Sequence, residues 1–365
     1  MITTGGTKGR SSYVPEQDAT VVARLRDAGA ILLGKTNIPE ICLSSETDNL
    51  VYGRTNNPYD LSRTPGGSSG GEAAIIAAGG SPLGIGTDIF GSIRLPCHWC
   101  GIAGIKPTSG RVPRTGDILA FSVGALDSWA QVGPLARYVE DLALTLPIIA
   151  GVDWRDPAMI PMPLGDPQTV KITSLRCAFY TDNGLVPASP QVADAVNAAA
   201  AALVDAGIRV EEACPTGVDR TYEINRHIVG GDGRSWIRRL LKRVGSTEVT
   251  PHLNRMESQA KTISTSEFTH WLEQMDRVRG EMLSFMASYD VILCPVNPFP
   301  AQLHGWRFLP NPVETVESFS KGLSHTYAYN LAGWPAAVVR AGTSEEGLPI
   351  GIQIVSRPWR EDVAL

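Results

Sequence analysis

The chain has 365 residues, 43% of them hydrophobic, and a formal net charge of −5 at pH 7, which suits a globular protein with a sizeable core. Lys and Arg are scattered, no apolar stretch reaches the roughly 18 residues that span a bilayer, and residues 1–18 lack the apolar core of a secretory signal. We therefore expect a cytoplasmic protein with no membrane span and no nucleic-acid partner.

The N-terminal part predicts one helix and then a turn-rich stretch. Asp18 is placed to cap a helix over residues 19–28, and Gly29 is placed to end it. Residues 30–33 (AILL) predict a short buried strand. Residues 35–65 are largely polar and rich in turn formers, so they predict a long loop region.

Two turns of glycine and serine follow, each before a predicted helix. Residues 66–71 (GGSSGG) open a helix of small residues over 72–80. Residues 82–87 predict a strand, and residues 88–94 (DIFGSIR) form a second turn that enters a helix. A serine thus stands at the start of two successive helices.

The rest of the chain alternates helices and strands, which implies an α/β fold with a sheet covered by helices. Residues 160–167 are an irregular, proline-rich connector. Apolar periodicity predicts helices at 138–146, 191–206 and 267–286, and runs rich in β-branched residues predict strands at 177–180, 208–210, 291–294, 336–339 and 350–355.

The six cysteines suggest reduced residues in or near the core, because several stand among apolar neighbours. Cys97 and Cys100 have the C-x-x-C spacing of a redox or metal site. However, neither a second cysteine pair nor a close pair of histidines accompanies them, so we expect no metal. His98, between them, is expected to be a packing residue and not a base.

Taken alone, the two serine turns have more than one interpretation. Residues 66–70 fit the G-x-S-x-G pattern of a nucleophile elbow, but the polar residues 60–65 end in proline, whereas an elbow follows a buried strand. A flexible linker or an anion-binding helix start would have the same pattern. Ser92 by itself would most simply be a helix N-cap.

The order of the motifs favours a catalytic interpretation of the two serine turns over a structural one. Residues 65–72, 86–96 and 101–108 resemble the signature of the amidase signature family closely and in order. The resemblance continues through residues 133–137, 289–295 and 347–353, and so covers nearly the whole chain. It implies one domain over residues 1–365, built on a mixed central β-sheet with helices on both faces.

The resemblance also implies a site. By position, the family's serine nucleophile falls on Ser92, and its bridging serine, within hydrogen-bond reach and held on a non-proline cis peptide, falls on Ser68; the third member is a lysine. Ser92 would attack the amide carbonyl, Ser68 would relay a proton, and an acyl-serine would then be hydrolysed. The resemblance requires neither a metal nor an organic cofactor. Backbone N–H groups of Ile89, Phe90, Gly91 and Ser92 would bind the oxyanion, and Ser69 would shape the site. Asp88 and Arg94 flank Ser92 and could contact substrate, but we expect them to form an ion pair that shapes the turn.

The sequence departs from the family pattern in three places. Phe90 stands where the family usually has a small residue, and its ring is expected to limit the acyl group. The family's lysine aligns upstream of Thr3, so this chain is expected to lack that segment, and Lys8 and Lys35 align with other roles. Residues 361–365 resemble the start of a helix and not its end, so the C-terminal end is also expected to be missing.

Three functions remain open at this stage. The first is an amidase that hydrolyses a small or medium carboxamide. The second is a subunit of a tRNA-dependent amidotransferase, although residues 94–97 (RLPC) differ from the RQPA that is usual there. The third is a non-catalytic protein that keeps the fold, for which the missing lysine is the evidence. The sequence also leaves a homodimer open and does not name the substrate.

Overall fold

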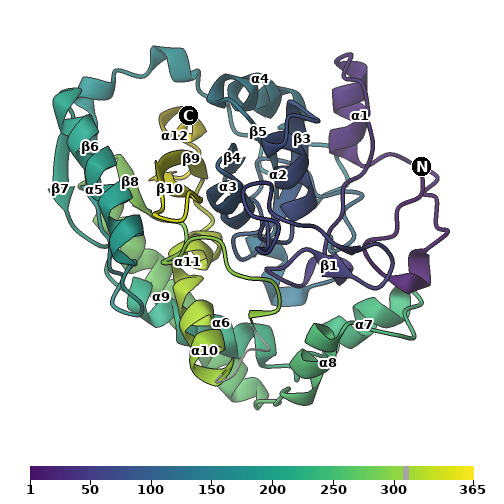
Figure 1. Cartoon of the computed structure of the whole chain (residues 1–365). Helices are drawn as coiled ribbons and strands as arrows, with labels where there is room; N and C mark the ends of the chain where they lie inside the picture. The colour runs from purple at the N-terminus through teal and green to yellow at the C-terminus, as the bar shows by residue number, and fades with distance from the viewer. Residues whose placement is uncertain (307–311) are drawn as a thin grey trace.

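The computed structural model describes residues 1–306 and 312–365, which fold around a mixed sheet of eight strands (Figure 1). The strand order is β3-β5-β4-β9-β10-β8-β6-β7. β6 pairs in parallel with β7 and β8, and the other neighbours are antiparallel. The strands are β3 (Leu83–Asp88), β4 (Ala103–Lys106), β5 (Gln131–Ala136), β6 (Arg176–Phe179), β7 (Arg209–Glu212), β8 (Val291–Pro295), β9 (Ala336–Thr343) and β10 (Pro349–Ser356), with a separate hairpin of β1 (Asp48–Asn49) and β2 (Gly53–Arg54).

Helices cover both faces of the sheet, as alternate residues of a central strand show. In β9, Ala337 packs in the cluster that includes α1 and α4, whereas Val338 packs in the cluster that includes α2 and α3. In β8, Leu293 likewise faces α5, and Ile292 faces α6, α9 and α11. The helices are α1 (Thr20–Asp27), α2 (Gly70–Ala77), α3 (Arg94–Cys100), α4 (Val139–Ile149), α5 (Pro190–Asp205), α6 (Thr221–Gly230), α7 (Ser235–Arg243), α8 (Pro251–Ser258), α9 (Thr265–Met286), α10 (Pro312–Gly322), α11 (Ser324–Ala332) and α12 (Glu361–Ala364).

Most elements predicted by periodicity are confirmed. The predicted helices at 138–146, 191–206 and 267–286 correspond to α4, α5 and α9. The five predicted strands correspond to β6, β7, β8, β9 and β10, and the strand predicted at 82–87 is β3. The proline-rich connector is irregular as far as Asp166. The mixed sheet and its two helical layers agree with the expected fold class.

Two local predictions for the N-terminal part are wrong. Residues 30–33 form no strand, and they are not buried: Ile31 is 85% exposed and Leu33 is 68% exposed. An apolar run this short does not reveal which neighbours cover it. Asp18 does not cap α1, because its carboxylate pairs with Arg26 at 2.7 Å.

The cysteines and His98 lie where the sequence analysis expected them. Cys97, Cys100, Cys177 and Cys294 are buried, the other two are half-buried, and all six are free thiols. His98 is buried, with its ring bound to the Phe299 carbonyl oxygen and to the Gly351 N–H. Burial lowers the pKa of His98 to about 4, so the ring is neutral at pH 7 and serves packing. Among the described residues, no helix is long and apolar enough to cross a membrane.

Candidate active site

The two serine turns meet at the N-terminal ends of α2 and α3, on the edge strand β3. The Ser69 N–H donates to the Ser92 carbonyl oxygen at 3.1 Å, which joins the turns directly. The Ser69 hydroxyl lies against the backbone N–H and carbonyl oxygen of Thr87, at 3.4 and 3.5 Å. Ser92 is half-buried just before α3, and Ser68 is only 1% exposed just before α2. The structure therefore brings the predicted serines together.

Close packing explains the glycines of the first turn. A Cβ atom on Gly67 would lie 2.4 Å from the Ser44 carbonyl oxygen, so the loop around Ser44 can approach only a glycine. The peptide between Gly67 and Ser68 is cis, as the resemblance implied. The turn-rich region before the first serine turn is thus the packing partner of that turn.

The surroundings of Ser68 include a residue that the sequence analysis did not single out. Cys42 lies close enough to the hydroxyls of Ser68 and Thr87 for them to affect the pKa of its thiol. Burial raises this pKa to about 12, although the two hydroxyls oppose the shift, so Cys42 is not a thiolate at pH 7. Among the described contacts, the Ser68 hydroxyl is not bonded to that of Ser92. A hydrogen bond between the two serines remains a prediction.

The second turn is held by a buried ion pair, as expected for Asp88 and Arg94. Both side chains are fully buried, and Arg94 Nη2 lies 3.0 Å from Asp88 Oδ1. Burial alone would raise the pKa of Asp88, but Arg94 lowers it to about 2. The carboxylate also accepts the N–H groups of Gly91 at 2.8 Å and Ile93 at 3.1 Å, so it closes the turn on itself.

The Arg94 guanidinium makes as many hydrogen bonds as it has N–H donors. A guanidinium has five N–H donors, and five side-chain hydrogen bonds leave Arg94. Two go to Asp88. The others go to the Thr326 carbonyl oxygen at 2.8 Å, to Gln353 Oε1 at 3.1 Å and to Asn330 Oδ1. Asn330 and Thr326 lie on α11, and no pattern in the sequence indicated that this helix contacts the turn.

The four predicted oxyanion donors differ in whether a described protein group accepts their N–H. Among the described residues, the N–H groups of Ile89, Phe90 and Ser92 have no acceptor. Gly91 is the exception, because its N–H is bound by Asp88. A Cβ atom on Gly91 would meet the Thr326 hydroxyl oxygen at 2.7 Å, and φ is +112° there, which explains the glycine.

The strand register gives the direction of the Ile89 N–H. Pro134 lies opposite Ile85 in the β3–β5 ladder and has no N–H, so their pair is of the non-hydrogen-bonded type. By alternation, Asp88 and Gln131 form a hydrogen-bonded pair, while the Thr87 N–H faces outward to Ser69. The same alternation, carried one residue past the strand, turns the Ile89 N–H to the side of the serine turns.

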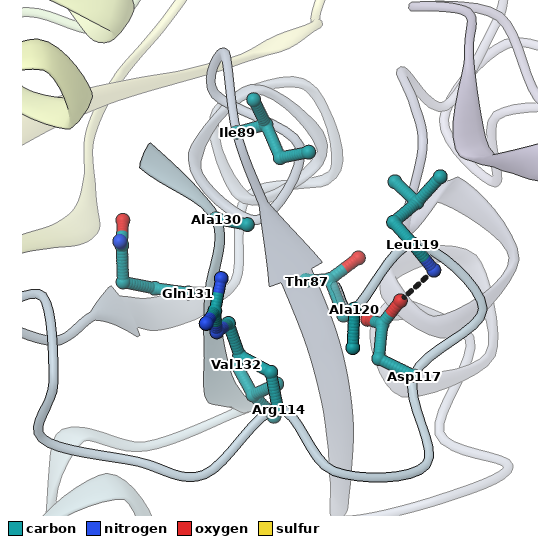
Figure 2. Close-up of a pocket in the computed structure, with 9 residues that line it drawn as sticks. All are labelled: Thr87, Ile89, Arg114, Asp117, Leu119, Ala120, Ala130, Gln131 and Val132. Carbon is teal, nitrogen blue, oxygen red and sulfur yellow. Dashed lines mark hydrogen bonds between the residues drawn. The ribbon is translucent and has the colours of Figure 1, made fainter. Parts of the chain in front are cut away.

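A small cavity lies beside this turn, between β3, β5 and the loop before residue 120 (Figure 2). Its volume is about 10 Å³, and Thr87, Ile89, Asp117 and Gln131 are among its lining residues. The Asp117 carboxylate accepts the Leu119 N–H at 2.6 Å, and burial raises the pKa of this carboxyl. A cavity of about this size holds one water-sized group.

The lysines near the site differ in environment. Lys8 forms an exposed ion pair with Glu248 at 2.7 Å, away from the serines. Burial, followed by repulsion from Arg10, lowers the pKa of Lys35, and the carboxylate of Asp117 partly opposes the shift. Lys106 is fully buried on β4, and burial, followed by repulsion from Arg94, lowers its pKa to about 7. In the described residues, none of them is hydrogen-bonded to Ser68.

Comparison with known proteins gives one consistent result. The family model described as Amidase matches residues 1–365. The chain is 35% identical to the A subunit of the glutamyl-tRNA(Gln) amidotransferase of Roseiflexus sp. (strain RS-1), over 100% of the chain and 77% of that protein. It is also 35% identical to an acylamidase of Rhodococcus erythropolis, over 100% of the chain and 76% of that protein. A solved structure of 6-aminohexanoate cyclic dimer hydrolase complexed with substrate superposes with a TM-score of 0.85 and 30% identity, over 99% of the chain and 79% of that structure.

Proposed function

Because the chain belongs to the amidase signature family, we propose that it hydrolyses a carboxamide with Ser92 as the nucleophile and Ser68 as the proton relay. The observation that carries the proposal is the junction of the two serine turns through the hydrogen bond from Ser69 to Ser92. This hydrogen bond supports the proposal because it joins the turn that carries Ser68 to the turn that carries Ser92.

The reaction has two halves. First, Ser92 Oγ forms a bond to the amide carbon, and the π electrons of the C=O bond move to its oxygen, which the free N–H groups bind. The Ser92 proton would pass to Ser68, while Ser68 would pass its own proton to the amine of the lysine that the family's scheme requires, which aligns upstream of Thr3. The intermediate then collapses, the C–N bond breaks, and the amine leaves with a proton. In the second half, water attacks the acyl-serine, which releases the carboxylic acid and restores Ser92.

The buried ion pair of Asp88 and Arg94 would support this reaction without contacting the substrate. Neither group is exposed to substrate, since both side chains are fully buried. Their role is to fix the turn that carries the oxyanion donors, so that little reorganisation accompanies the appearance of negative charge. The relatives act on different amides by name, so the family alone does not choose the acyl group.

A second candidate function is a glutaminase-type subunit of a tRNA-dependent amidotransferase, in which the same chemistry releases ammonia for a partner protein. The observation that favours it is the identity of 33–35% to several glutamyl-tRNA(Gln) amidotransferase A subunits. The difference at residues 94–97 opposes it. A panel of aliphatic and aryl amides, tested on the purified chain with glutamine as one member, separates the two functions.

The first prediction tests the roles of the serines. We expect a fluorophosphonate probe to label Ser92, with one label per chain by intact mass. Ser92→Ala should abolish labelling and lower kcat/KM for an amide by about 10⁴-fold or more. Ser68→Ala should slow both labelling and turnover, because the relay is lost.

The matched control is Ser62→Ala, which removes an exposed hydroxyl that donates to Asp60 Oδ1. It should label and turn over like the wild type. Labelling that survives in Ser92→Ala, or that maps to another serine, would overturn the assignment.

A further inference from the structure

We infer that Asn330, supported by Thr326 of the same helix, is a positioning residue that sets the direction of the oxyanion donors. The inference rests on the proposed function. It concerns α11, which contributes no group to the reacting atoms and lies more than 230 residues after the turn.

Asn330 binds the first peptide of the turn. Its Nδ2 group lies 3.2 Å from the Asp88 carbonyl oxygen and 2.8 Å from Asp88 Oδ1. The carbonyl of Asp88 and the N–H of Ile89 belong to one planar trans peptide, so they point in opposite directions. The ladder pair of Asp88 and Gln131 also restrains this carbonyl, so the bond from Asn330 is a second restraint, and what restrains the carbonyl also restrains the N–H that would meet the oxyanion.

Thr326 binds the third peptide of the same turn. Its hydroxyl lies 2.9 Å from the Phe90 carbonyl oxygen, and Asp88 binds the Gly91 N–H at the other end of that peptide. The same hydroxyl is 2.8 Å from the Leu323 carbonyl oxygen, so its single proton serves one carbonyl at a time. With the first and third peptides held, the Phe90 N–H between them has little freedom to rotate.

Asn330 can do this because every polar atom of its side chain is engaged away from water. It is fully buried, its Oδ1 accepts from Arg94, and its Nδ2 also reaches the Trp129 carbonyl oxygen at 3.1 Å. In a low-dielectric interior such bonds hold orientation strongly, and a missing partner leaves a charged neighbour unsatisfied.

Gln353 provides a matched control within the same network. It is also fully buried, and its Oε1 accepts from Arg94 at 3.1 Å. Its amide nitrogen, however, binds the carbonyl oxygens of Pro295 and His325, not the turn. Removing Gln353 therefore removes comparable buried hydrogen bonds without freeing an oxyanion donor.

The experiment compares Asn330→Ala, Gln353→Ala and wild type with one amide substrate and with a peptide-aldehyde-type inhibitor that forms a tetrahedral adduct. For Asn330→Ala we expect kcat to fall about 10- to 100-fold, KM to change less than about threefold, and inhibitor Ki to rise in parallel with the loss in kcat. Gln353→Ala should lower the midpoint of urea unfolding with less than a threefold change in kcat. Equal kinetic losses in the two variants would overturn the inference.

A second pair of variants covers the case in which Asn330→Ala does not fold. Thr326→Val keeps the shape but removes the hydroxyl, whereas Thr326→Ser keeps the hydroxyl. We expect Thr326→Val to lower kcat and raise inhibitor Ki about 3- to 10-fold, and Thr326→Ser to restore both. Identical behaviour of Val and Ser would contradict the inference. If the proposed function itself were wrong, the wild type would neither hydrolyse amides nor acquire a label on Ser92, which is a separate outcome.

Discussion

Phe90 puts an aromatic ring next to the proposed nucleophile. The ring is half-buried and meets Trp129 edge to face, with centroids 6.2 Å apart and planes at 89°. We expect the size of this ring to limit the acyl group, because Phe90 stands two residues before Ser92. Among the described residues, the Phe90 N–H has no acceptor.

We expect Phe90→Gly to raise kcat/KM for bulky amides more than for acetamide, because removal of the ring enlarges the space beside Ser92. The two substrates, measured on the same preparation, control for any loss of folded protein. An equal change for both would show that the ring points away from the acyl group. The loss of the edge-to-face contact, worth about 0.5–1.5 kcal/mol, should appear separately as lower stability.

Lys106 is a buried amine whose partners suit the neutral form. Its Nζ donates to two carbonyl oxygens, those of Pro107 at 3.0 Å and of Trp334. A neutral amine has two N–H donors, which matches these two acceptors. The lowered pKa of about 7 agrees with that count.

The lowered pKa of Lys106 should affect how the stability of the protein depends on pH. Between pH 7 and about 10, the unfolded chain, whose lysines titrate near 10.4, binds one more proton here than the folded chain does. The free energy of unfolding should therefore rise with pH, by at most about 1.4 kcal/mol per pH unit from this group. Lys106→Met should reduce that slope in urea unfolding at pH 7, 8 and 9. The exposed Lys8→Met serves as control, and an unchanged slope in Lys106→Met would contradict the assignment.

At the scale of elements, a single arginine of α1 binds carbonyl oxygens at the C-terminal end of α4. The Arg24 guanidinium reaches the carbonyl oxygens of Ile149, Ala150 and Gly151 at 2.8–2.9 Å, and that of Val152 at 2.9 Å. The last carbonyls of a helix have no partner within the helix, and the C-terminal end of its dipole favours a cation. The contact therefore fixes α1 to α4 on one face of the sheet.

Arg24→Ala should lower the free energy of unfolding by about 1.5–3 kcal/mol, the usual range for hydrogen bonds to a charged group. Arg26→Ala, on the same helix, is the matched control. Its guanidinium is exposed and pairs with Asp18, so a change of less than about 1 kcal/mol is expected. Urea denaturation of both variants measures the difference, and equal losses would show that the carbonyl contacts add nothing.

Over the whole molecule, sequence periodicity predicted the helices and strands whose residues follow a regular apolar pattern. The long amphipathic helix α9 and the β-branched strand β8 were predicted because their residues alternate between core and solvent, or between two buried faces. Residues 30–33 have the same apolar character and were predicted wrongly, since burial depends on neighbours that a short run does not reveal.

The site residues that lie in short sequence motifs could be predicted. Those that come from distant parts of the chain could not. The two serine turns could be identified from their motifs. Cys42, Thr326 and Asn330 could not, because each reaches the site only after the sheet has been ordered. The order β3-β5-β4-β9 places the end of β3 near α11, and no spacing in the sequence encodes that neighbourhood.

The contact between Asp88 and Asn330 joins residues 242 positions apart, which has a consequence for biosynthesis. A ribosome releases Asp88 and Ser92 long before it has translated α11, so the nascent turn has no Asn330 to hold its first peptide. The contact is also non-local, so forming it costs the entropy of closing a long loop. If Ser92 is the nucleophile as proposed, a growing chain displays it before Asn330 can orient the donors beside it, and we expect its full reactivity only after α11 has been made.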